Sequence, residues 1–271
     1  MLRFERVAYA AAARAGALLR ARYRDPQEVS FKSEVDLVTA ADREAEALII
    51  DTLAAAFPAH GIVAEESPAR AGRDGHRWYV DPLDGTTNFA HGHPHFAVSL
   101  ALARDDELLL GLVHDPIREE TFTAVRGGGA RLNGAPITVS EVSALERALL
   151  GTGFPYDCRS HGDFYVAFFG EAIRRAQGVR RAGSAALDLC YVACGRLDGF
   201  WEWKLHPWDT AAGRLIVEEA GGRVSDFAAA RHQLTGDETA ASNGRLHEEL
   251  LGMIAAVRSR LAHEESARAG V

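Results

Sequence analysis

Segments with helical and strand-like patterns alternate along nearly the whole chain, and this alternation constrains the fold more than any other feature. Apolar residues at helical spacing predict helices at residues 2–23, 39–57, 161–177, 184–194, 210–220 and 246–261. Short apolar runs between turn-prone residues predict strands at 61–64, 78–80, 96–103, 108–114, 120–125, 148–152, 178–182, 199–203 and 239–242. Because both kinds of element must bury their apolar faces against each other, we expect an α/β or α+β fold built in layers.

No internal repeat and no low-complexity linker interrupts the 271 residues. This length suits one large domain or two intimately packed halves, and we expect a single unit over residues 1–271 that divides near residue 145. Residues 30–38 suit a short hairpin or extended stretch, and Asn133-Gly134 predicts a tight turn. The tail at 263–271 is expected to be frayed.

Charge and cysteine content exclude several classes of protein. The formal net charge is −8, whereas a general nucleic-acid binder is usually basic, so no direct nucleic-acid partner is expected. An anionic substrate would then need bound cations as local compensation. Cys158, Cys190 and Cys194 form no disulfide framework. Cys190 and Cys194 are expected to be buried thiols rather than half of a zinc site.

The hydrophobic runs give no indication of a membrane segment. The longest apolar run near the middle, 108–113, is far too short to cross a bilayer. The N-terminus is rich in Ala and Arg like a transit peptide, but it contains Glu5 early, lacks Ser and continues into helix-patterned sequence. We therefore expect a surface helix of the mature fold in a cytoplasmic protein.

The most informative motif is Asp81-Pro82-Leu83-Asp84-Gly85-Thr86-Thr87-Asn88, which follows the buried strand 78–80. If the chain turns between Asp81 and Asp84, as Pro82 favours, the two carboxylates converge, and Gly85 lets the backbone approach a ligand closely. A helical turn over 86–90 would point N–H groups at the same place. Carboxylates beside N–H donors predict a site for hard cations that bridge to a phosphate. The purely structural alternative is a capped turn whose acidic side chains are solvated.

Other acidic residues occupy similar positions. Glu65-Glu66 follows the strand 61–64, and the carboxyl ends of strands are the usual location of α/β sites. Asp209 precedes a predicted helix, where it could act as N-cap, metal ligand or both. Asp42 is explained by capping with Thr39, and it could also orient a hydroxyl group or a water. Asp36 lies on the other side of the same segment.

Several polar residues have an ordinary structural interpretation. His91, His93 and His95 alternate as in a metal site, but Pro94 and Phe96 beside them favour a packed loop. Arg180-Arg181 fits a surface pair better than a phosphate clamp. Glu202 lies between Trp201 and Trp203, so its charge should face a cavity or find a partner.

Taken together, these motifs resemble the inositol monophosphatase family, within it the bacterial inositol-1-monophosphatase branch. The matching segments cover nearly the whole chain: Lys32 to Thr39 with Asp42, Ala64 to Ser67, Asp81 to Asn88, Gly151 to Tyr156, Gly183 to Ala186, Pro207 to Gly213 and Glu219 to Gly222. Each is modest alone, but their order and spacing make the set specific. Many relatives have one more residue in the loop after Lys32, which leaves the role of Lys32 open.

The resemblance implies an αβαβα sandwich, usually a homodimer, and a role for each matching residue. Glu65, Asp81, Asp84, Asp209 and the Leu83 carbonyl resemble ligands of two or three Mg²⁺ ions. Asp42 and Thr86 resemble the pair that positions and deprotonates the attacking water, with Glu65 beside them. The phosphate cradle would comprise Gly85, Thr86 and the following amides. The substrate contacts would come from Asp84, Gly183, Ser184, Ala185, Glu202 and Asp209.

The expected activity is therefore Mg²⁺-dependent hydrolysis of a small phosphomonoester, first of all inositol 1-phosphate, with inhibition by Li⁺. Fructose 1,6-bisphosphate, histidinol phosphate and 3′-phosphoadenosine 5′-phosphate are alternatives of the same chemistry. A bisphosphate would need cations at its second phosphate, for which Arg180 and Arg181 are the candidates. Some bacterial relatives also bind the transcription machinery, so a regulatory binding protein is the alternative of a different class. A purely structural metal-binding protein would leave Thr86, Asp42 and Glu202 without a role.

Overall fold

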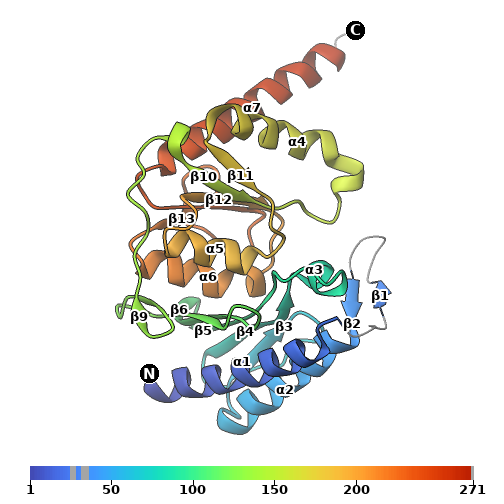
Figure 1. Ribbon diagram of the computed structural model, residues 1–271, viewed down its shortest axis with the longest axis vertical. Coiled ribbons are helices and arrows are strands. Elements are labelled where there is room, and N and C mark those ends of the chain that lie inside the picture. Colours follow the sequence, from blue (N-terminus) through green and yellow to red (C-terminus); the bar gives the residue numbers. More distant parts are fainter. Residues whose placement is uncertain (25–28, 32–36, 270–271) are drawn as a thin grey trace.

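The structure, a computed structural model, describes residues 1–24, 29–31 and 37–269. Figure 1 shows five layers in which helices and sheets alternate, which confirms the expected layered α/β class. From the bottom of that view, the layers are α1 and α2, a first sheet, α5 and α6, a second sheet, and α4 with α7. These helices are α1 (Leu2–Arg22), α2 (Ala40–Ala56), α4 (Cys158–Arg175), α5 (Ala185–Ala193), α6 (Pro207–Glu219) and α7 (His247–Ala269).

The first sheet has seven strands in the order β3-β4-β5-β6-β7-β8-β9. Its strands are β3 (Gly61–Ala64), β4 (His76–Asp84), β5 (Ala97–Arg104), β6 (Glu107–Asp115), β7 (Glu120–Val125), β8 (Ala130–Leu132) and β9 (Ala135–Pro136). β3 and β4 are parallel, and the later neighbours form the predicted antiparallel meander. Asn133 and Gly134 join β8 to β9 with φ of 50° and 82°, the positive angles of a tight hairpin turn.

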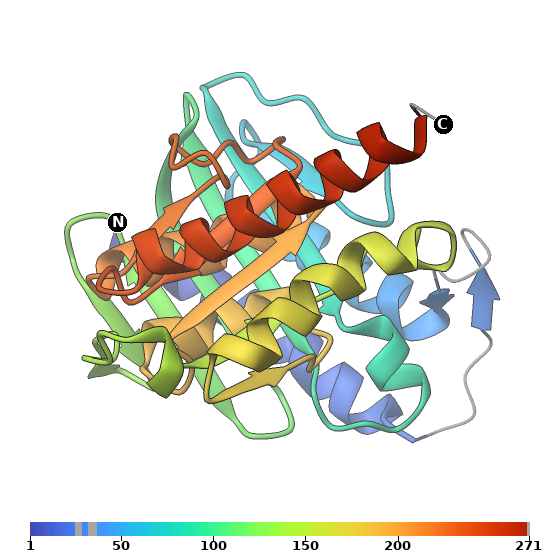
Figure 2. The same cartoon turned by 90° about the horizontal axis from the view of Figure 1, so that it is seen from above.

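The second sheet has five strands in the order β11-β10-β12-β14-β13. Its strands are β10 (Leu149–Thr152), β11 (Gly178–Arg180), β12 (Gly199–Trp203), β13 (Arg223–Ser225) and β14 (Glu238–Ser242). β10 runs parallel to both β11 and β12, whereas β14 is antiparallel to β12 and β13. Figure 2, seen from above, shows α4 and α7 lying across this sheet. The predicted strands of the second half are thereby confirmed, and β13 is an addition.

Three apolar clusters fill the spaces between the layers. One joins α1 and α2 to the first sheet, another packs α5 and α6 between the sheets, and the third joins the second sheet to α4 and α7. α1 presents mainly alanines to the first cluster, including Ala8, Ala11 and Ala15, which have no exposed surface. Small side chains at this spacing let the helix approach its neighbours closely. Buried area of this kind is the main stabilising contribution to such a fold.

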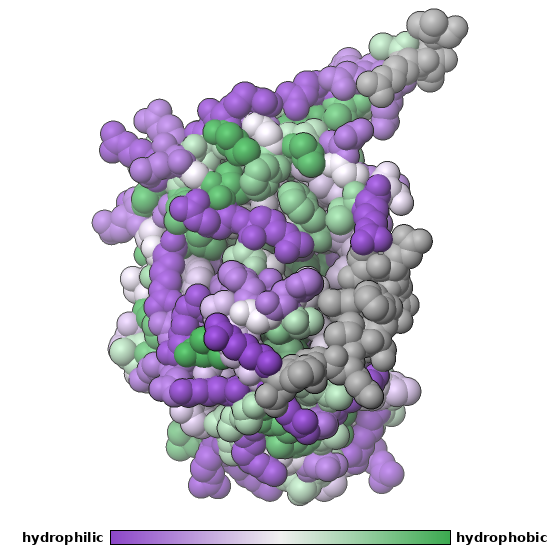
Figure 3. All heavy atoms as spheres, turned by 45° about the vertical axis from the view of Figure 1, so that its right-hand side comes forward, coloured by the Kyte–Doolittle hydropathy of each residue, from purple (hydrophilic) through white to green (hydrophobic). Residues whose placement is uncertain are grey.

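The remaining elements complete the structure around the site. Two short strands, β1 (Val29–Phe31) and β2 (Leu37–Thr39), pair antiparallel and confirm the hairpin expected near 30–38. The short helix α3 (Thr86–Ala90) follows β4, as predicted, and a 3-10 turn (Leu145–Arg147) precedes β10. No helix of the described chain combines the length and the apolar character needed to cross a membrane. Figure 3 shows hydrophilic side chains over much of one face, interspersed with apolar ones.

Three local predictions were wrong. The chain does not leave the strand at Pro82, because β4 continues to Asp84 through an irregularity in its pairing. The tail expected to be frayed continues α7 as far as Ala269. α6 begins at Pro207 with His206 as N-cap, so Asp209 is the third residue of the helix rather than its cap. Lys32 and Asp36 lie outside the described residues.

Candidate active site

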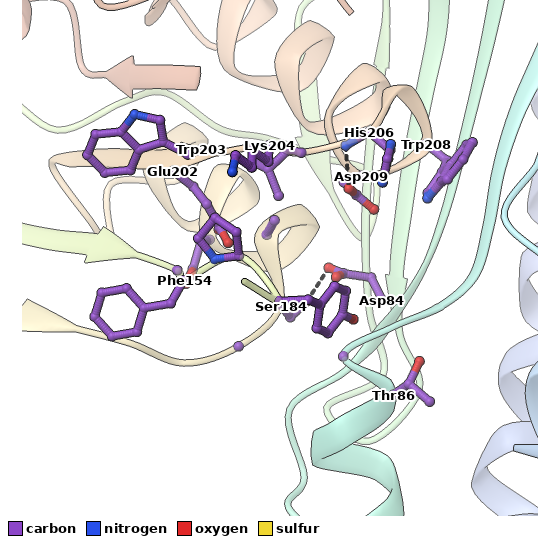
Figure 4. Close-up of a pocket in the computed structure, with 18 of the residues that line it drawn as sticks. Asp84, Thr86, Phe154, Ser184, Glu202, Trp203, Lys204, His206, Trp208 and Asp209 are labelled. Carbon is purple, nitrogen blue, oxygen red and sulfur yellow. Dashed lines mark hydrogen bonds between the residues drawn. The ribbon is translucent and has the colours of Figure 1, made fainter. Parts of the chain in front are cut away.

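A cavity of about 650 Å³ lies where α3, β4 and the segment after β3 meet α5, α6 and β12. Figure 4 shows Asp84, Thr86, Ser184, Glu202 and Asp209 around this pocket, with aromatic side chains further out. These residues come from both halves of the chain. The pocket therefore brings together most of the residues singled out in the sequence, and the two halves have to be packed together for it to form.

Asp81 and Asp84 are directed by a bulge at the end of β4. In the pairing with β5, Asp81 faces Ser99 and Asp84 faces Ala97, so three steps on β4 match two on β5. One extra residue of this kind bends a strand and changes the direction of its side chains. Asp81 is 1% exposed, and its Oδ1 accepts a hydrogen bond from the Leu83 amide at 2.9 Å.

Asp84 is held by the other half of the chain. Its Oδ2 accepts hydrogen bonds from the Ser184 hydroxyl at 2.5 Å and the Ala186 amide at 2.8 Å. Ser184 is the N-cap of α5. One oxygen of Asp84 is thus fixed at the start of this helix, where backbone N–H groups favour a negative charge. Gly183, Ser184 and Ala185 all line the pocket, as predicted for that segment.

Glu65 and Asp209 approach from two further elements. Glu65 follows β3, where its amide donates to the Val80 carbonyl at 3.2 Å. The next amide, of Glu66, donates to Glu46 Oε2 at 2.7 Å. Asp209 lies in the first turn of α6, and its Oδ2 accepts from the His206 amide at 2.6 Å. Sequence reasoning missed Glu46, although an acid on the buried face of α2 beside Ala45 and Ile49 was a usable signal.

The electrostatics show that these carboxylates face one another. Burial raises the pKa of Asp81 far above its ordinary range, and the charges of Glu65, Asp84 and Asp209 raise it further. Burial, followed by Asp84 and Glu65, likewise raises the pKa of Asp209. The pKa of Asp84 rises to about 6 through burial, although the bonds from Ser184 and Ala186 oppose the shift.

The donor set fits hard divalent cations. Four carboxylates and the Leu83 carbonyl offer oxygen atoms, the kind of ligand that Mg²⁺ prefers, and a cation among buried carboxylates would relieve their mutual repulsion. The charges of Glu65 and Asp84 add to burial in raising the pKa of both Asp81 and Asp209, so a cation among these groups would relieve the repulsion.

Asp42 and Thr86 form the hydrogen-bonded pair that the sequence suggested. Thr86 Oγ1 lies 2.9 Å from Asp42 Oδ1 and 3.0 Å from the Leu83 carbonyl. Asp42 Oδ2 accepts from the amide of Thr39 at 2.8 Å and from its hydroxyl at 2.5 Å, completing the predicted capping box of α2. Burial raises the pKa of Asp42, while hydrogen bonds from Thr39 and Thr86 lower it.

The turn at Gly85 depends on the absence of a side chain. Gly85 has φ of +98°, and a Cβ there would lie 3.1 Å from the His95 carbonyl and 3.2 Å from the Gly183 carbonyl. Asn88 Nδ2 donates to the same region, to the His95 carbonyl at 2.7 Å and the Ala182 carbonyl at 2.9 Å. These bonds dock α3 onto the segment before α5, a role of Asn88 that sequence reasoning did not identify.

Two places in the structure contain histidines that could be considered as metal ligands: the loop with His95, and the start of β4 with His60 and His76. His95 is buried with its ring against Tyr191, which agrees with the packed-loop interpretation. At the opposite end of β4 from Asp84, ligand atoms of His60, Asp74 and His76 lie within 4.8 Å of one another, a spacing that could hold a metal ion. However, Trp78 Nε1 donates to His60 Nδ1 at 3.0 Å, so the neutral ring carries its proton on Nε2, facing Asp74. That tautomer favours a hydrogen-bonded group over ligation.

The structure also places the cysteines and the two adjacent arginines. Cys158, Cys190 and Cys194 are free thiols. Cys190 is buried, as expected, whereas Cys194 is only partly buried. Arg180 and Arg181 are both exposed, which agrees with the interpretation as a surface pair. Arg181 also lines the pocket, with its guanidinium 5.7 Å from the Phe154 ring centre.

Comparisons with known proteins show to which family the chain belongs. The sequence profile of the inositol monophosphatase family matches residues 2–261. The chain is 44% identical over 248 residues to a protein named Nus factor SuhB from Escherichia coli K12, covering 90% of this chain and 93% of that one. It is 44% identical over 257 residues to inositol-1-monophosphatase of Synechocystis, covering 94% and 90%.

Solved structures show the same similarity. The extragenic suppressor protein suhB from Bartonella henselae superimposes with a TM-score of 0.89 at 42% identity, covering 92% of this chain and 97% of that one. Inositol monophosphatase from Anabaena has a TM-score of 0.85 at 40% identity, with coverage of 93% and 95%. With the family profile spanning nearly all of the sequence, the chain belongs to the inositol monophosphatase family.

Proposed function

We propose that this protein is a Mg²⁺-dependent phosphomonoester hydrolase with inositol 1-phosphate as its principal substrate. The observation that carries the proposal is the convergence of Glu65, Asp81, Asp84 and Asp209 beside the hydrogen-bonded pair of Asp42 and Thr86. Membership of the family supports phosphatase activity, and a relative named inositol-1-monophosphatase supports the choice of substrate. We further infer a cytoplasmic homodimer.

The four carboxylates and the Leu83 carbonyl would hold two or three Mg²⁺ ions. When bound, these ions supply positive charge to the phosphoryl oxygens, acidify a water and stabilise the leaving oxygen. Asp84 is suited to a fixed position among the ligands, since Ser184 and Ala186 already hold its Oδ2. Its other oxygen remains available to a cation.

Thr86 and Asp42 would orient the attacking water. With its proton donated to Asp42 Oδ1, the Thr86 hydroxyl has lone pairs free to accept a hydrogen bond from water. A proton leaving the water can pass through Thr86 to Asp42, whose raised pKa favours its uptake. Glu65 lines the same pocket as Thr86 and would assist this pair.

The phosphate and the substrate ring would lie on opposite sides of Asp84. On one side, Gly85, Thr86 and the amides at the start of α3 would cradle the phosphate. On the other side, the substrate's hydroxyl groups would contact Gly183, Ser184, Ala185 and Glu202, with Asp84 and Asp209 shared between metal and substrate. Water attack in line with the leaving oxygen requires no covalent phosphoenzyme.

Phosphate release from a substrate panel tests the proposal. The panel comprises inositol 1-phosphate, fructose 1,6-bisphosphate, histidinol phosphate and 3′-phosphoadenosine 5′-phosphate, each with Mg²⁺, with EDTA, and with Mg²⁺ plus Li⁺. We expect Mg²⁺-dependent release led by inositol 1-phosphate. Folded protein that releases phosphate from none of them would refute the proposal, and faster hydrolysis of another member would move the assignment to that substrate.

A second candidate function is regulatory binding to the transcription machinery. It is favoured by the 44% identity to proteins named Nus factor SuhB. Pull-down from the native lysate, with and without Mg²⁺, would test it, using mass spectrometry to identify transcription proteins. An Asp84→Asn variant that captures them as well as the wild type would show that binding is independent of catalysis. Absence of transcription proteins under both conditions would exclude this function.

A further inference from the structure

Asp188 is a buried acid that the proposed reaction does not yet use. It lies on α5, whose other buried residues are apolar, and it is 2% exposed. Its Oδ1 has no hydrogen-bond partner, and no described residue donates to the carboxylate, although Asp188 lines the active-site pocket. Because buried carboxylates are almost always hydrogen-bonded or paired, this one indicates a missing partner.

Glu202 is in a similar situation next to it. It is 9% exposed, lines the same pocket from β12, and accepts no hydrogen bond from the described residues. Figure 4 shows Glu202 among the side chains around the cavity. Its position depends on Gly153, because a Cβ there would lie 2.1 Å from both carboxylate oxygens of Glu202. The missing side chain of Gly153 therefore makes room for this acid.

The two acids lie over two glycines at the end of β10, Gly151 within the strand and Gly153 directly after it. A Cβ on Gly151 would lie 3.5 Å from the Asp188 Cγ, just as a Cβ on Gly153 would meet the Glu202 carboxylate. Alternate residues of a strand share a face and lie roughly 6.6 Å apart. Two adjacent hydroxyl groups, each hydrogen-bonded to one carboxyl group, can fit such a separation.

The charges around the pair favour hydroxyl groups over an ammonium group. Burial and the nearby Asp188 raise the pKa of Glu202, which favours a carboxyl group that can both donate and accept. Burial and then Asp84 raise the pKa of Asp188, while the charge of Arg181 lowers it. A hydroxyl group also both donates and accepts, whereas an ammonium group only donates.

We propose that Asp188, together with Glu202, binds two adjacent hydroxyl groups of the substrate and so selects polyol phosphates over phosphomonoesters that lack them. This inference rests on the proposed phosphatase function and adds Asp188 as a specificity-determining residue. It also gives Gly153 a positioning role, because this glycine leaves the space that the Glu202 carboxylate occupies.

The test compares wild type with Asp188→Asn and Asp188→Leu on two substrates. Inositol 1-phosphate carries adjacent hydroxyl groups, and p-nitrophenyl phosphate carries none. Loss of a hydrogen bond to a charged group corresponds to roughly tenfold to a hundredfold. We expect Asp188→Leu to lower kcat/KM for inositol 1-phosphate by that factor, mainly through KM, with little change for p-nitrophenyl phosphate. Asp188→Asn, which keeps one acceptor, should lie between the two.

Thermal unfolding separates this role from a structural one. Since no described residue donates a hydrogen bond to Asp188, both variants should keep or raise the melting temperature. The matched control is Asp115→Asn, a fully buried acid that accepts from Ile117 and Arg118. It should lower the melting temperature and leave the ratio of kcat/KM for the two substrates unchanged.

The outcomes are distinguishable. An unchanged substrate ratio and unchanged KM for inositol 1-phosphate in Asp188→Leu would overturn the inference while leaving the proposed function intact. Histidinol phosphate, which carries an ammonium group, is measured as a third substrate, and a loss confined to it would overturn the inference in favour of an ammonium subsite. Wild type that hydrolyses no phosphomonoester would overturn the proposed function itself. If p-nitrophenyl phosphate is not hydrolysed, the KM for inositol 1-phosphate alone decides.

Discussion

Replacing Asp84 by Asn removes one negative charge from the candidate metal site with little disturbance of the fold. The Asn amide oxygen can still accept from Ser184 Oγ and the Ala186 amide, the two bonds that position this side chain. The other carboxylate oxygen becomes an NH₂ group, which points a donor at the place of a cation. The change therefore tests the electrostatics of the site separately from its architecture.

The expected loss of activity is at least about a hundredfold in turnover, the scale of one strong electrostatic contact in the transition state. At about 1.36 kcal/mol per factor of ten, this corresponds to about 2.7 kcal/mol or more. The fold should not lose stability, because Asp84 contributes to the repulsion that raises the pKa of Asp81 and Asp209. In EDTA the melting temperature should equal or exceed that of wild type.

Two measurements check this prediction. Phosphate release at saturating Mg²⁺ gives the loss in turnover, and thermal unfolding with and without Mg²⁺ gives the stabilisation by the ion. Wild type should gain melting temperature on addition of Mg²⁺, and Asp84→Asn should gain much less. Asp115→Asn, at a residue that is not among those lining the pocket, should respond to Mg²⁺ like wild type. Turnover of Asp84→Asn near the wild-type value, with an undiminished response to Mg²⁺, would show that Asp84 is no metal ligand.

Four further outcomes are expected. Asp209→Asn should lower turnover at least about a hundredfold at saturating Mg²⁺, whereas near-wild-type turnover would exclude Asp209 as a ligand. Li⁺ should inhibit phosphate release in steady-state assays, and complete insensitivity at high Li⁺ would count against this type of site. Gly153→Ala should raise KM for inositol 1-phosphate, because its Cβ would displace the Glu202 carboxylate; an unchanged KM contradicts that placement. In EDTA, the melting temperature of wild type should fall relative to that of Asp84→Asn as pH rises from 3.8, the ordinary pKa of an Asp, to about 6, because Asp84 ionises over this range. Mg²⁺ should abolish the difference between the two proteins.

The sign of this pH dependence follows from the raised pKa of Asp84. Between the ordinary pKa of 3.8 and the folded value of about 6, the folded protein binds more protons at this group than the unfolded chain. Stability from the group is present below that window and is lost as pH rises through it. A bound cation removes the effect because it favours the ionised carboxylate.

Local chemistry made much of the fold predictable. The capping box of Thr39 and Asp42, the turn at Asn133-Gly134 and the alternation of helix and strand patterns each depend on residues close in sequence. The acids at the ends of β3 and β4 were visible for the same reason, since a buried strand that runs directly into carboxylates is a local pattern. The family resemblance then supplied the expectation that distant motifs meet.

Predictions failed where neighbours in space outweigh neighbours in sequence. Pro82 favours a turn in an isolated segment, but pairing with β5 keeps β4 extended to Asp84. An isolated Asp209 is a good helix cap, but its carboxylate bonds back to the His206 amide and leaves the cap position to His206. Glu46 lies 20 residues from Glu66 in the sequence, and only the packing of α2 brings its carboxylate to that amide.

The sequence by itself thus determined which residues could form helices, strands, turns and cation ligands, because these tendencies come from backbone conformation and short-range contacts. Only the tertiary structure decided that Ser184 holds Asp84 from 100 residues away, and that Asp188 and Glu202 line the same pocket. The physical reason is that burial and charge repulsion depend on which atoms are close after the layers have packed. The same carboxylate is ordinary in solvent and becomes a ligand site when several are buried together.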